Sequence, residues 1–294
     1  MARRIAGRRR SGRLPITSAR LARPVQEAAQ RELGVLHRIG LAVERVARES
    51  ARSPHRADVV AMGASGTPTE ELDRLAEGAI LQALDREGVN WNVVSEEVGA
   101  VDRGGTKTLV IDPIDGTANA VRNLPFSTVS LALGKDDLGG VELGLVRDLT
   151  RGTTYWAAKG EGAFRDGRPI HARAWPGRGE VVFVNLGRAA SPPSVALGGK
   201  ARRVRSLGCA SLEMVLVAEG AGDAYLFENA DEQKNLRATD IAAAYRILLE
   251  AGGGASDTRG GSLDSFPLGV VRRTAVLAWG DRAYRDVLWG APVP

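Results

Sequence analysis

The sequence predicts a two-domain protein in which an α+β half is followed by an α/β half. Two helical patterns precede a long series of strand patterns in the first half, an order typical of an α+β domain. Strand and helix patterns alternate in the second half, as in an α/β layer. A break rich in proline and glycine, WPGRGE at 175–180, separates the two. We therefore predict domains over residues 27–178 and 179–294, preceded by a tail at 1–26.

The α+β half begins with two helices. Between residues 27 and 50, apolar residues recur at the spacing of one helix face; they are Leu33, Val35, Leu36, Ile39, Val43 and Val46. The segment GASGTPTEE at 63–71 predicts a flexible loop, because glycine, proline and threonine favour loops. A second helix is predicted over 72–88, with Gly88 at its end.

Strands follow the second helix. Apolar segments bounded by turn residues are typical of strands at hairpin or meander spacing. They lie at 91–97, 107–112, 127–134, 141–148 and 153–170, and the last contains glycine turns.

In the α/β half, strands and helices are expected to alternate. The predicted strands are 181–185, 223–227, GGGAS at 252–256 and 273–280, and the predicted helices are 209–220 and 239–253.

The composition is that of an ordinary globular protein, with 44% hydrophobic and 26% charged residues. No apolar run approaches the roughly 18 residues that span a bilayer, so a membrane protein is not expected. The single cysteine, Cys209, excludes an intrachain disulfide and favours a cytoplasmic location. Because the histidines (His37, His55 and His171) are scattered, we expect oxygen ligands rather than a zinc site.

The positive charge is concentrated in the first 26 residues. The formal net charge is +5, but residues 1–26 carry eight arginines and no acidic residue, which leaves 32 basic and 35 acidic residues elsewhere. A basic segment with few large apolar residues cannot form a core, so a disordered extension is the favoured interpretation. The favoured interpretation also includes translated sequence upstream of the true start. Binding of nucleic acid or anionic lipid and a transit peptide remain alternatives.

The segment VIDPIDGTAN at 110–119 carries the strongest chemical signal. Asp112 lies at or just beyond the carboxyl end of a buried strand. Pro113 has a fixed φ and no N–H, so it makes a stiff turn that frees the Ile114 carbonyl and brings Asp115 back near Asp112. Two carboxylates and a carbonyl are hard oxygen ligands, which suit Mg²⁺.

An anion site is predicted directly after these ligands. Gly116 allows close approach of the backbone to a ligand, and Thr117 begins a helix-like run whose N–H groups and dipole attract an anion. A cation site beside an anion site indicates phosphate chemistry. The simpler alternative is that the aspartates only cap a turn and a helix.

Acidic residues also follow another strand pattern and begin a helix pattern. Glu96 and Glu97 follow the apolar segment WNVVS, and Asp240 follows Thr239 at the start of the helix at 239–253. Taken singly, the glutamates suit a solvated strand edge, and Thr239 and Asp240 suit an N-cap pair. Together with the first acidic segment, they favour one shared site.

Three segments resemble the signatures of the inositol monophosphatase family: SEE at 95–97, DPIDGT at 112–117 and TDIAAAYRILLEAGG at 239–253. The members of this family are magnesium-dependent, lithium-sensitive phosphomonoesterases related to fructose-1,6-bisphosphatase. GTPTEELD at 66–73 and LRATDIAAA at 236–244 resemble archaeal-type members, which hydrolyse fructose 1,6-bisphosphate and inositol monophosphates. The resemblance extends from about residue 33 to the C-terminus.

The resemblance implies a layered αβαβα sandwich, a homodimer and an active site between the two domains. It assigns Glu96, Asp112 and the Ile114 carbonyl to one Mg²⁺ ion, and Asp112, Asp115 and Asp240 to a second. A weaker third ion is implied at Glu96, with help from Glu97.

The resemblance also implies catalytic and substrate contacts. Asp73 and Thr117 are expected to polarise the attacking water, and Glu96 completes the expected catalytic set. The expected substrate-binding residues are Asp115, Gly116, Thr117, Ala210 and Arg237. For Arg237, contact with a second phosphate and a place at a solvated helix start are both open.

Direct attack by water agrees with the residues, because the sequence lacks a Ser–His or Cys–His pairing. We therefore expect hydrolysis of a phosphomonoester, with inositol 1-phosphate and fructose 1,6-bisphosphate as leading substrates. The alternatives are 3′-phosphoadenosine 5′-phosphate, histidinol phosphate, and a catalytically weak homologue that binds nucleic acid through its tail.

The sequence departs from the family pattern near the expected substrate position. Thr239 stands where many members have tryptophan, and the segment 228–235 is longer and more acidic than the pattern. Glu228 is a candidate acceptor for a substrate hydroxyl. A further set of basic residues suits either a substrate phosphate or a surface charge run: Arg202, Arg203 and Arg205.

Overall fold

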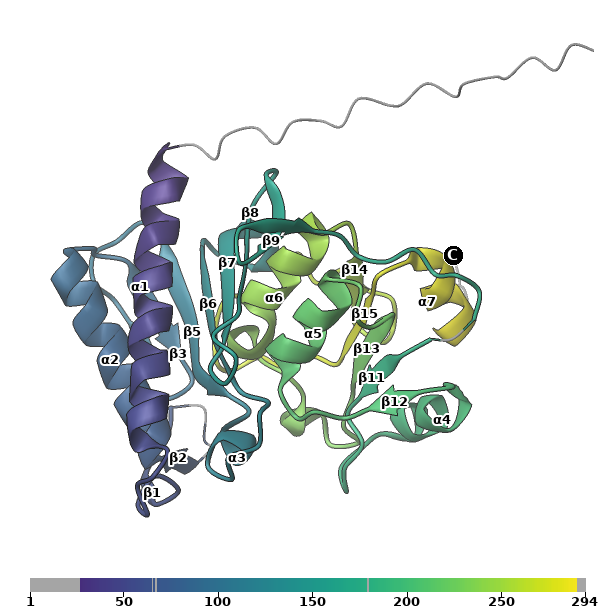
Figure 1. Ribbon diagram of the computed structural model, residues 1–294, viewed down its shortest axis with the longest axis horizontal. Helices are drawn as coiled ribbons and strands as arrows, with labels where there is room; N and C mark the ends of the chain where they lie inside the picture. The colour runs from purple at the N-terminus through teal and green to yellow at the C-terminus, as the bar shows by residue number, and fades with distance from the viewer. Residues whose placement is uncertain (1–26, 65, 67, 179, 290–294) are drawn as a thin grey trace, which may run out of the picture.

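The computed structural model describes residues 27–64, 66, 68–178 and 180–289, and it consists of five stacked layers (Figure 1). Two helices cover one face of a large sheet, two more lie between this sheet and a smaller one, and two short helices cover the far side of the smaller sheet. The layer order helix, sheet, helix, sheet, helix confirms the expected αβαβα sandwich.

The helices of the described residues are α1 (Glu27–Ser50), α2 (Glu71–Glu87), α3 (Thr117–Ala120), α4 (Pro192–Lys200), α5 (Ala210–Ala218), α6 (Ala238–Glu250) and α7 (Arg282–Trp289). Helix α1 has the predicted bounds, and α2 begins one residue before its predicted start. Gly88 ends α2 as predicted, with a φ of 65° that places it in the left-handed region favoured by glycine.

The large sheet has eight strands in the order β10-β9-β8-β7-β6-β5-β3-β4. Their bounds are β3 (Asn92–Ser95), β4 (Gly99–Val101), β5 (Thr108–Asp115), β6 (Thr128–Gly134), β7 (Val141–Asp148), β8 (Thr154–Ala158), β9 (Gly162–Arg165) and β10 (Arg168–Ile170). Along β5, Leu109 and Ile111 pack with α1 and α2, whereas Val110 packs with α5 and α6. Because helices cover both faces, the central strands are continuous apolar runs.

One pairing in this sheet positions the candidate site. β3 and β5 are parallel neighbours, with Ser95 opposite Ile111. Glu96 and Asp112 each follow one of these paired residues, so the two acidic residues reach the same edge of the sheet.

The smaller sheet has five strands in the order β12-β11-β13-β15-β14. Their bounds are β11 (Val182–Val184), β12 (Val204–Arg205), β13 (Ala224–Phe227), β14 (Gly254–Ser256) and β15 (Val276–Trp279). β11 is parallel to β12 and β13, and β15 is antiparallel to β13 and β14. Tyr225 packs towards α5 and α6, whereas Leu226 packs with Leu197 of α4 and Tyr284 of α7.

Several elements of the structure differ from those that the sequence predicted. The loop predicted at 63–71 contains β2 (Pro68–Glu70), which pairs with β1 (Val59–Met62) in a separate antiparallel sheet. Helices α4 and α7 have no predicted counterpart. α4 contains two prolines and two glycines, which have low helix propensity, and it begins where the Ser191 side chain accepts the Ser194 N–H.

Within the described part of the chain, no helix combines the length and apolar character that a membrane span requires. The tail expected at 1–26 lies outside the described residues.

Candidate metal and phosphate site

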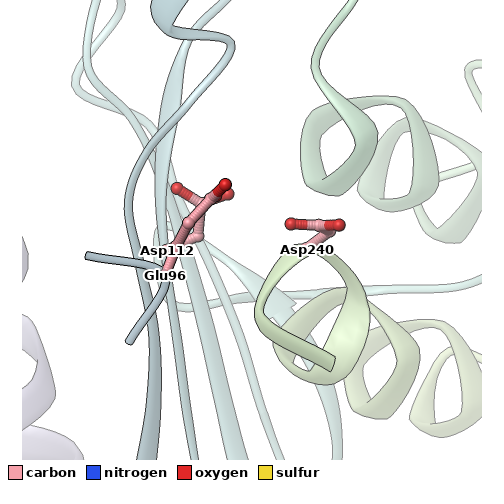
Figure 2. Close-up of side chains that lie close together, drawn as sticks. All are labelled: Glu96, Asp112 and Asp240. Carbon is pink, nitrogen blue, oxygen red and sulfur yellow. The ribbon is translucent and has the colours of Figure 1, made fainter. Parts of the chain in front are cut away.

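Three carboxylates from distant parts of the chain converge at the edge of the large sheet. Glu96 follows β3, Asp112 lies in β5, and Asp240 lies in the first turn of α6. Each offers an oxygen atom within 4.8 Å of the others. Figure 2 shows Glu96 and Asp112 together on one side, with the Asp240 carboxylate facing them from α6.

The backbone around Asp112 explains how it is presented. β5 continues to Asp115 instead of ending at Asp112, but its pairing with β6 shifts in register between these two residues. Pro113 lies in the shifted segment and has no N–H for the sheet. The Ile114 N–H donates to Asp112 Oδ1 over 3.1 Å, so the interruption itself orients the carboxylate.

Asp240 is held by the start of its own helix. α6 begins at Ala238, and Asp240 is its third residue rather than part of an N-cap pair with Thr239. The Arg237 N–H donates to Asp240 Oδ2 over 2.7 Å. The carboxylate is therefore oriented by a helix N-terminus, where negative charge is favourable.

The electrostatics of the carboxylate cluster favour a cation. Burial, followed by repulsion from Asp115, Glu96 and Asp240, raises the pKa of Asp112 well above its ordinary value. Burial and repulsion from Glu96 also raise the pKa of Asp240. Arg237 forms an ion pair with Glu96, so it offsets part of this charge. A hard divalent cation fits this donor set of carboxylate oxygens.

Asp73 and Thr117 lie together beside the carboxylate cluster. Thr117 Oγ1 is 3.0 Å from Asp73 Oδ1 and 2.8 Å from the Ile114 carbonyl oxygen. Burial, followed by repulsion from Glu97, raises the pKa of Asp73 to about 7. The structure thus brings a threonine hydroxyl and a buried carboxyl group together, and their role as a water-polarising pair stays a prediction.

Gly116 occupies a tightly enclosed position at the start of α3. Its φ is 84°, and a Cβ atom there would lie 2.6 Å from the Phe126 carbonyl oxygen. Any larger residue would therefore be strained and would displace the neighbouring backbone. The structure shows that neighbouring backbone approaches Gly116 closely, and contact of Gly116 with a ligand stays a prediction.

Asp115 bonds to the N-terminal end of α5. Its carboxylate accepts from the Ser211 N–H and hydroxyl, each at 2.6 Å, and from the Ala210 N–H at 3.2 Å. Asp115 does not belong to the set of three carboxylates, although its charge acts on Asp112. These contacts bring Ala210, a predicted substrate contact, next to the Asp115 loop.

Several other predicted residues do not belong to the set of three carboxylates. Glu97 bonds the Thr69 hydroxyl, and burial raises its pKa to about 7. Glu228 accepts hydrogen bonds from Ser191 and Thr258 in a neighbouring pocket. Three of the basic candidates are exposed near β12: Arg202, Arg203 and Arg205.

Two residues in the site were not identified from the sequence. Ser211 donates to Asp115, and the Asn119 amide donates to the Phe126 carbonyl at 2.9 Å and the Leu207 carbonyl at 2.7 Å. Asn119 thus ties the loop that contains Gly116 to the loop before α5. The only sequence signal was the position of each residue inside a motif, because their partners are distant in the chain.

Known proteins are similar to this chain in sequence and in fold. The model of the inositol monophosphatase family matches residues 29–282. A fructose-1,6-bisphosphatase/inositol-1-monophosphatase of Methanothermobacter thermautotrophicus is 34% identical over 264 residues, covering 84% of this chain and 91% of that protein. A bifunctional NADP phosphatase/NAD kinase of Methanococcus maripaludis is 28% identical, covering 79% of this chain and 44% of that protein.

A solved structure agrees with these sequence relatives. The crystal structure of an inositol monophosphatase-fructose 1,6 bisphosphatase superposes with a TM-score of 0.75 at 30% identity, covering 87% of this chain and 97% of that one. The family match includes all three converging carboxylates, Glu96, Asp112 and Asp240. This chain therefore belongs to the inositol monophosphatase family.

Proposed function

We propose that this protein is a Mg²⁺-dependent phosphatase that hydrolyses small phosphomonoesters, with inositol 1-phosphate and fructose 1,6-bisphosphate as leading substrates. The observation that carries the proposal is the convergence of Glu96, Asp112 and Asp240 within 4.8 Å. The names of the relatives support both substrates.

The proposed metal ligands are the carboxylates of Glu96, Asp112, Asp115 and Asp240 and the carbonyl of Ile114. These oxygen donors suit two Mg²⁺ ions, with a weaker third at Glu96. When bound, Mg²⁺ supplies positive charge that makes water more acidic and stabilises phosphoryl and leaving oxygens. Competition by Li⁺ is expected from the family resemblance.

Residues of the protein are proposed to activate the water and to hold the phosphate. The proposed base for the attacking water is the Thr117–Asp73 pair, in which Asp73 takes up the proton through the threonine hydroxyl. The Gly116 and Thr117 N–H groups, together with Ala210 at the start of α5, are proposed to hold the phosphate. Cys209 is buried, and its Sγ lies 3.3 Å from the Asp115 carbonyl oxygen, so it is poorly placed as a nucleophile.

The test is phosphate release from purified enzyme with Mg²⁺, with and without Li⁺. We expect Asp112→Asn and Asp240→Asn each to lower kcat by at least about 10²-fold while the circular dichroism spectrum is retained. Mg²⁺ should raise the Tm of the wild type, because a ligand that binds only the folded state stabilises it. Near-wild-type turnover in either variant contradicts the ligand assignment.

A nucleotide phosphate is the second candidate substrate. The relative named as an NADP phosphatase/NAD kinase supports it, although this chain covers only 44% of that protein. The panel therefore includes NADP, 3′-phosphoadenosine 5′-phosphate and histidinol phosphate. If kcat/KM is at least tenfold higher for a nucleotide than for both leading substrates, the nucleotide becomes the proposed substrate in their place.

We further propose a homodimer in which each chain has domains over 27–178 and 179–294. Light scattering coupled to size-exclusion chromatography tests the dimer, and a monomer mass at micromolar concentration contradicts it.

A further inference from the structure

A buried arginine outside the carboxylate cluster contacts two of the elements that carry proposed site residues. Arg56 lies in the turn at 51–58, between α1 and β1, and it is 7% exposed. In the part of the chain that the structure describes, no carboxylate forms an ion pair with its guanidinium group, which donates to neutral oxygen atoms instead. Because a buried charge without a counterion is costly, Arg56 depends on these hydrogen bonds.

The guanidinium group of Arg56 joins its own turn to the segment that follows α3. Nη1 donates to the Ala51 carbonyl oxygen and to the Asn123 side-chain oxygen, each at 3.0 Å, and Nη2 donates to the Val121 carbonyl oxygen. A guanidinium group can reach several acceptors at once because its N–H donors are spread over a rigid plane. The turn before β1 and helix α3 are therefore tied together, and both lie at the same end of the large sheet (Figure 1).

These contacts support a helix that is too short to be stable alone. α3 has four residues, and a helix of this length depends on tertiary contacts. The Val121 N–H donates to the Thr117 carbonyl oxygen at 2.9 Å, and Asn123 has a left-handed φ of 58°. Arg56 thus holds the end of the single helical turn whose first residue is Thr117.

The main chain at Arg56 holds the start of α2. The Leu72 N–H donates to the Arg56 carbonyl oxygen at 3.2 Å, and the Glu71 N–H donates to the Asp58 carbonyl oxygen at 2.9 Å. The first N–H groups of a helix have no partner within the helix, so the turn at 51–58 satisfies two of them. Asp73 is the third residue of α2 and directly follows these bonds.

Arg56 therefore contacts both helices that supply the proposed water-polarising pair. Its carbonyl oxygen holds α2, which carries Asp73, and its side chain holds the end of α3, which begins at Thr117. The pair itself meets in one hydrogen bond of 3.0 Å. A relative shift of the two helices by about 1 Å would break such a bond, and misplacement of about this size costs roughly 10²-fold in rate.

We propose that Arg56 is a positioning residue for the reaction: it holds α2 and α3 at the separation at which the Asp73 carboxyl group meets the Thr117 hydroxyl. The inference rests on the proposed phosphatase function and extends it to a residue that contacts neither the carboxylate cluster nor the pair. Arg56 acts through the placement of the pair, so its effect on turnover disappears when the pair is absent.

The experiment is a double-mutant cycle between Arg56 and Thr117, measured as kcat for inositol 1-phosphate at saturating Mg²⁺. Arg56→Met keeps an apolar stem but has no N–H donors, and it should lower kcat about tenfold or more because the pair loses its alignment. In the Thr117→Val background the same substitution should change kcat less than twofold, since residues that act as a unit are not additive. Arg52→Ala is the matched control, because Arg52 is exposed in the same turn, and it should keep the wild-type kcat.

The outcomes separate this inference from the proposed function. If the wild type releases no phosphate, the function itself is contradicted. If the wild type is active, a fall in kcat of fivefold or more in Arg56→Met that shrinks below twofold in the Thr117→Val background supports the positioning role.

Three results overturn the positioning role and leave the phosphatase function intact. The first is a fall of less than fivefold in Arg56→Met. The second is a fall that stays at twofold or more in the Thr117→Val background, because a general loss of stability acts equally in both backgrounds. The third is a kcat for Thr117→Val within threefold of the wild type, because the pair would then take no part in turnover.

A second variant tests the same contact if circular dichroism shows that Arg56→Met does not fold. Asn123→Gly removes one acceptor of the Arg56 guanidinium group, and glycine adopts the left-handed φ of 58° without strain. It enters the same cycle with Thr117→Val, and the same outcomes apply with a threshold of threefold in place of fivefold.

Discussion

At the residue scale, the proposed chemistry depends on the two polar groups that the Thr117 hydroxyl contacts. Its hydroxyl lies between the Asp73 carboxyl group and the Ile114 carbonyl, which is itself a proposed metal ligand. One side chain therefore connects the N-terminal end of α2 with the interrupted strand β5. Removing the hydroxyl without changing the shape of the side chain isolates this connection.

We predict that Thr117→Val lowers kcat by roughly 10²- to 10⁴-fold, because proton transfer from water loses its relay to Asp73. Thr117→Ser keeps the hydroxyl and is the matched control, with most of the activity retained. Steady-state kinetics with inositol 1-phosphate measures both variants. A kcat for Thr117→Val within threefold of the wild type would remove Thr117 from the catalytic set.

A second residue, Glu213, is expected to make the free energy of unfolding depend on pH. Glu213 of α5 is 3% exposed, and burial raises its pKa to about 8, although its Oε1 accepts the Leu207 N–H at 2.7 Å. Between about pH 4.5 and pH 8 the folded state keeps a proton that the unfolded state has lost. The contribution of Glu213 to the free energy of unfolding is therefore most favourable below pH 4.5, and it is lost as the pH rises towards 8.

We predict that Glu213→Gln raises the stability by roughly 1–3 kcal/mol at pH 8 and leaves it unchanged near pH 4. The glutamine keeps an oxygen acceptor for the Leu207 N–H but never ionises. Urea unfolding at several pH values measures the effect, and Glu49→Gln at an exposed position of α1 is the control. An equal gain at both pH values would exclude ionisation of Glu213 as the cause.

At the element scale, the close contact between α6 and β7 determines where Asp240 lies. Gly144 of β7 faces Ala243 of α6, and a Cβ atom at Gly144 would lie 2.5 Å from the Ala243 carbonyl oxygen. The helix can reach the sheet this closely only because the strand has no side chain there. Asp240 lies on the same helix one turn before Ala243, so the packing of α6 also positions a proposed ligand.

We predict that Gly144→Ala moves α6 away from the sheet, lowers the stability by about 1–3 kcal/mol and raises the Mg²⁺ concentration for half-maximal activity several-fold. Gly78→Ala in α2 is the control, because a Cβ atom at Gly78 meets no atom within 4 Å. It should be neutral or slightly stabilising, since alanine favours a helix more than glycine. Unchanged Mg²⁺ dependence in a destabilised Gly144→Ala would separate the packing from the site.

At the scale of the whole molecule, the candidate site is assembled from three layers. The large sheet supplies Glu96 and Asp112, the inner helix layer supplies Asp240 and Ala210, and the outer helix α2 supplies Asp73. All the residues of the proposed metal and phosphate site lie between residues 73 and 240. The arginine-rich segment 1–26 contributes none of them.

We therefore predict that deletion of residues 1–26 leaves kcat/KM within twofold of the full chain. The deletion removes eight positive charges and no negative charge, so it should also weaken retention on a polyanionic resin at low salt. Activity assays and salt elution measure the two effects on the same pair of proteins. A large loss of activity would assign the tail a role in the site.

Much of the fold was predictable because its signals are local. The spacing of apolar residues predicted α1 over its full length, and the motif around Asp112 predicted an oxygen-ligand cluster. The elements that were missed have weak local signals. β2 lies in a segment of loop-forming residues, and α4 contains prolines and glycines that are held in a helix by their tertiary setting.

The sequence by itself determined the α+β and α/β halves, the three acidic motifs and the family that they resemble, because periodicity and short motifs act over a few neighbouring residues. The layered sandwich followed only from that resemblance. Only the tertiary structure decided that the Asp115 carboxylate bonds to the start of α5 and that Arg237 forms an ion pair with Glu96. These contacts join residues far apart in the chain, and they arise when strand pairing and helix packing bring separate layers together. Composition and spacing along the chain do not say which distant residues come into contact.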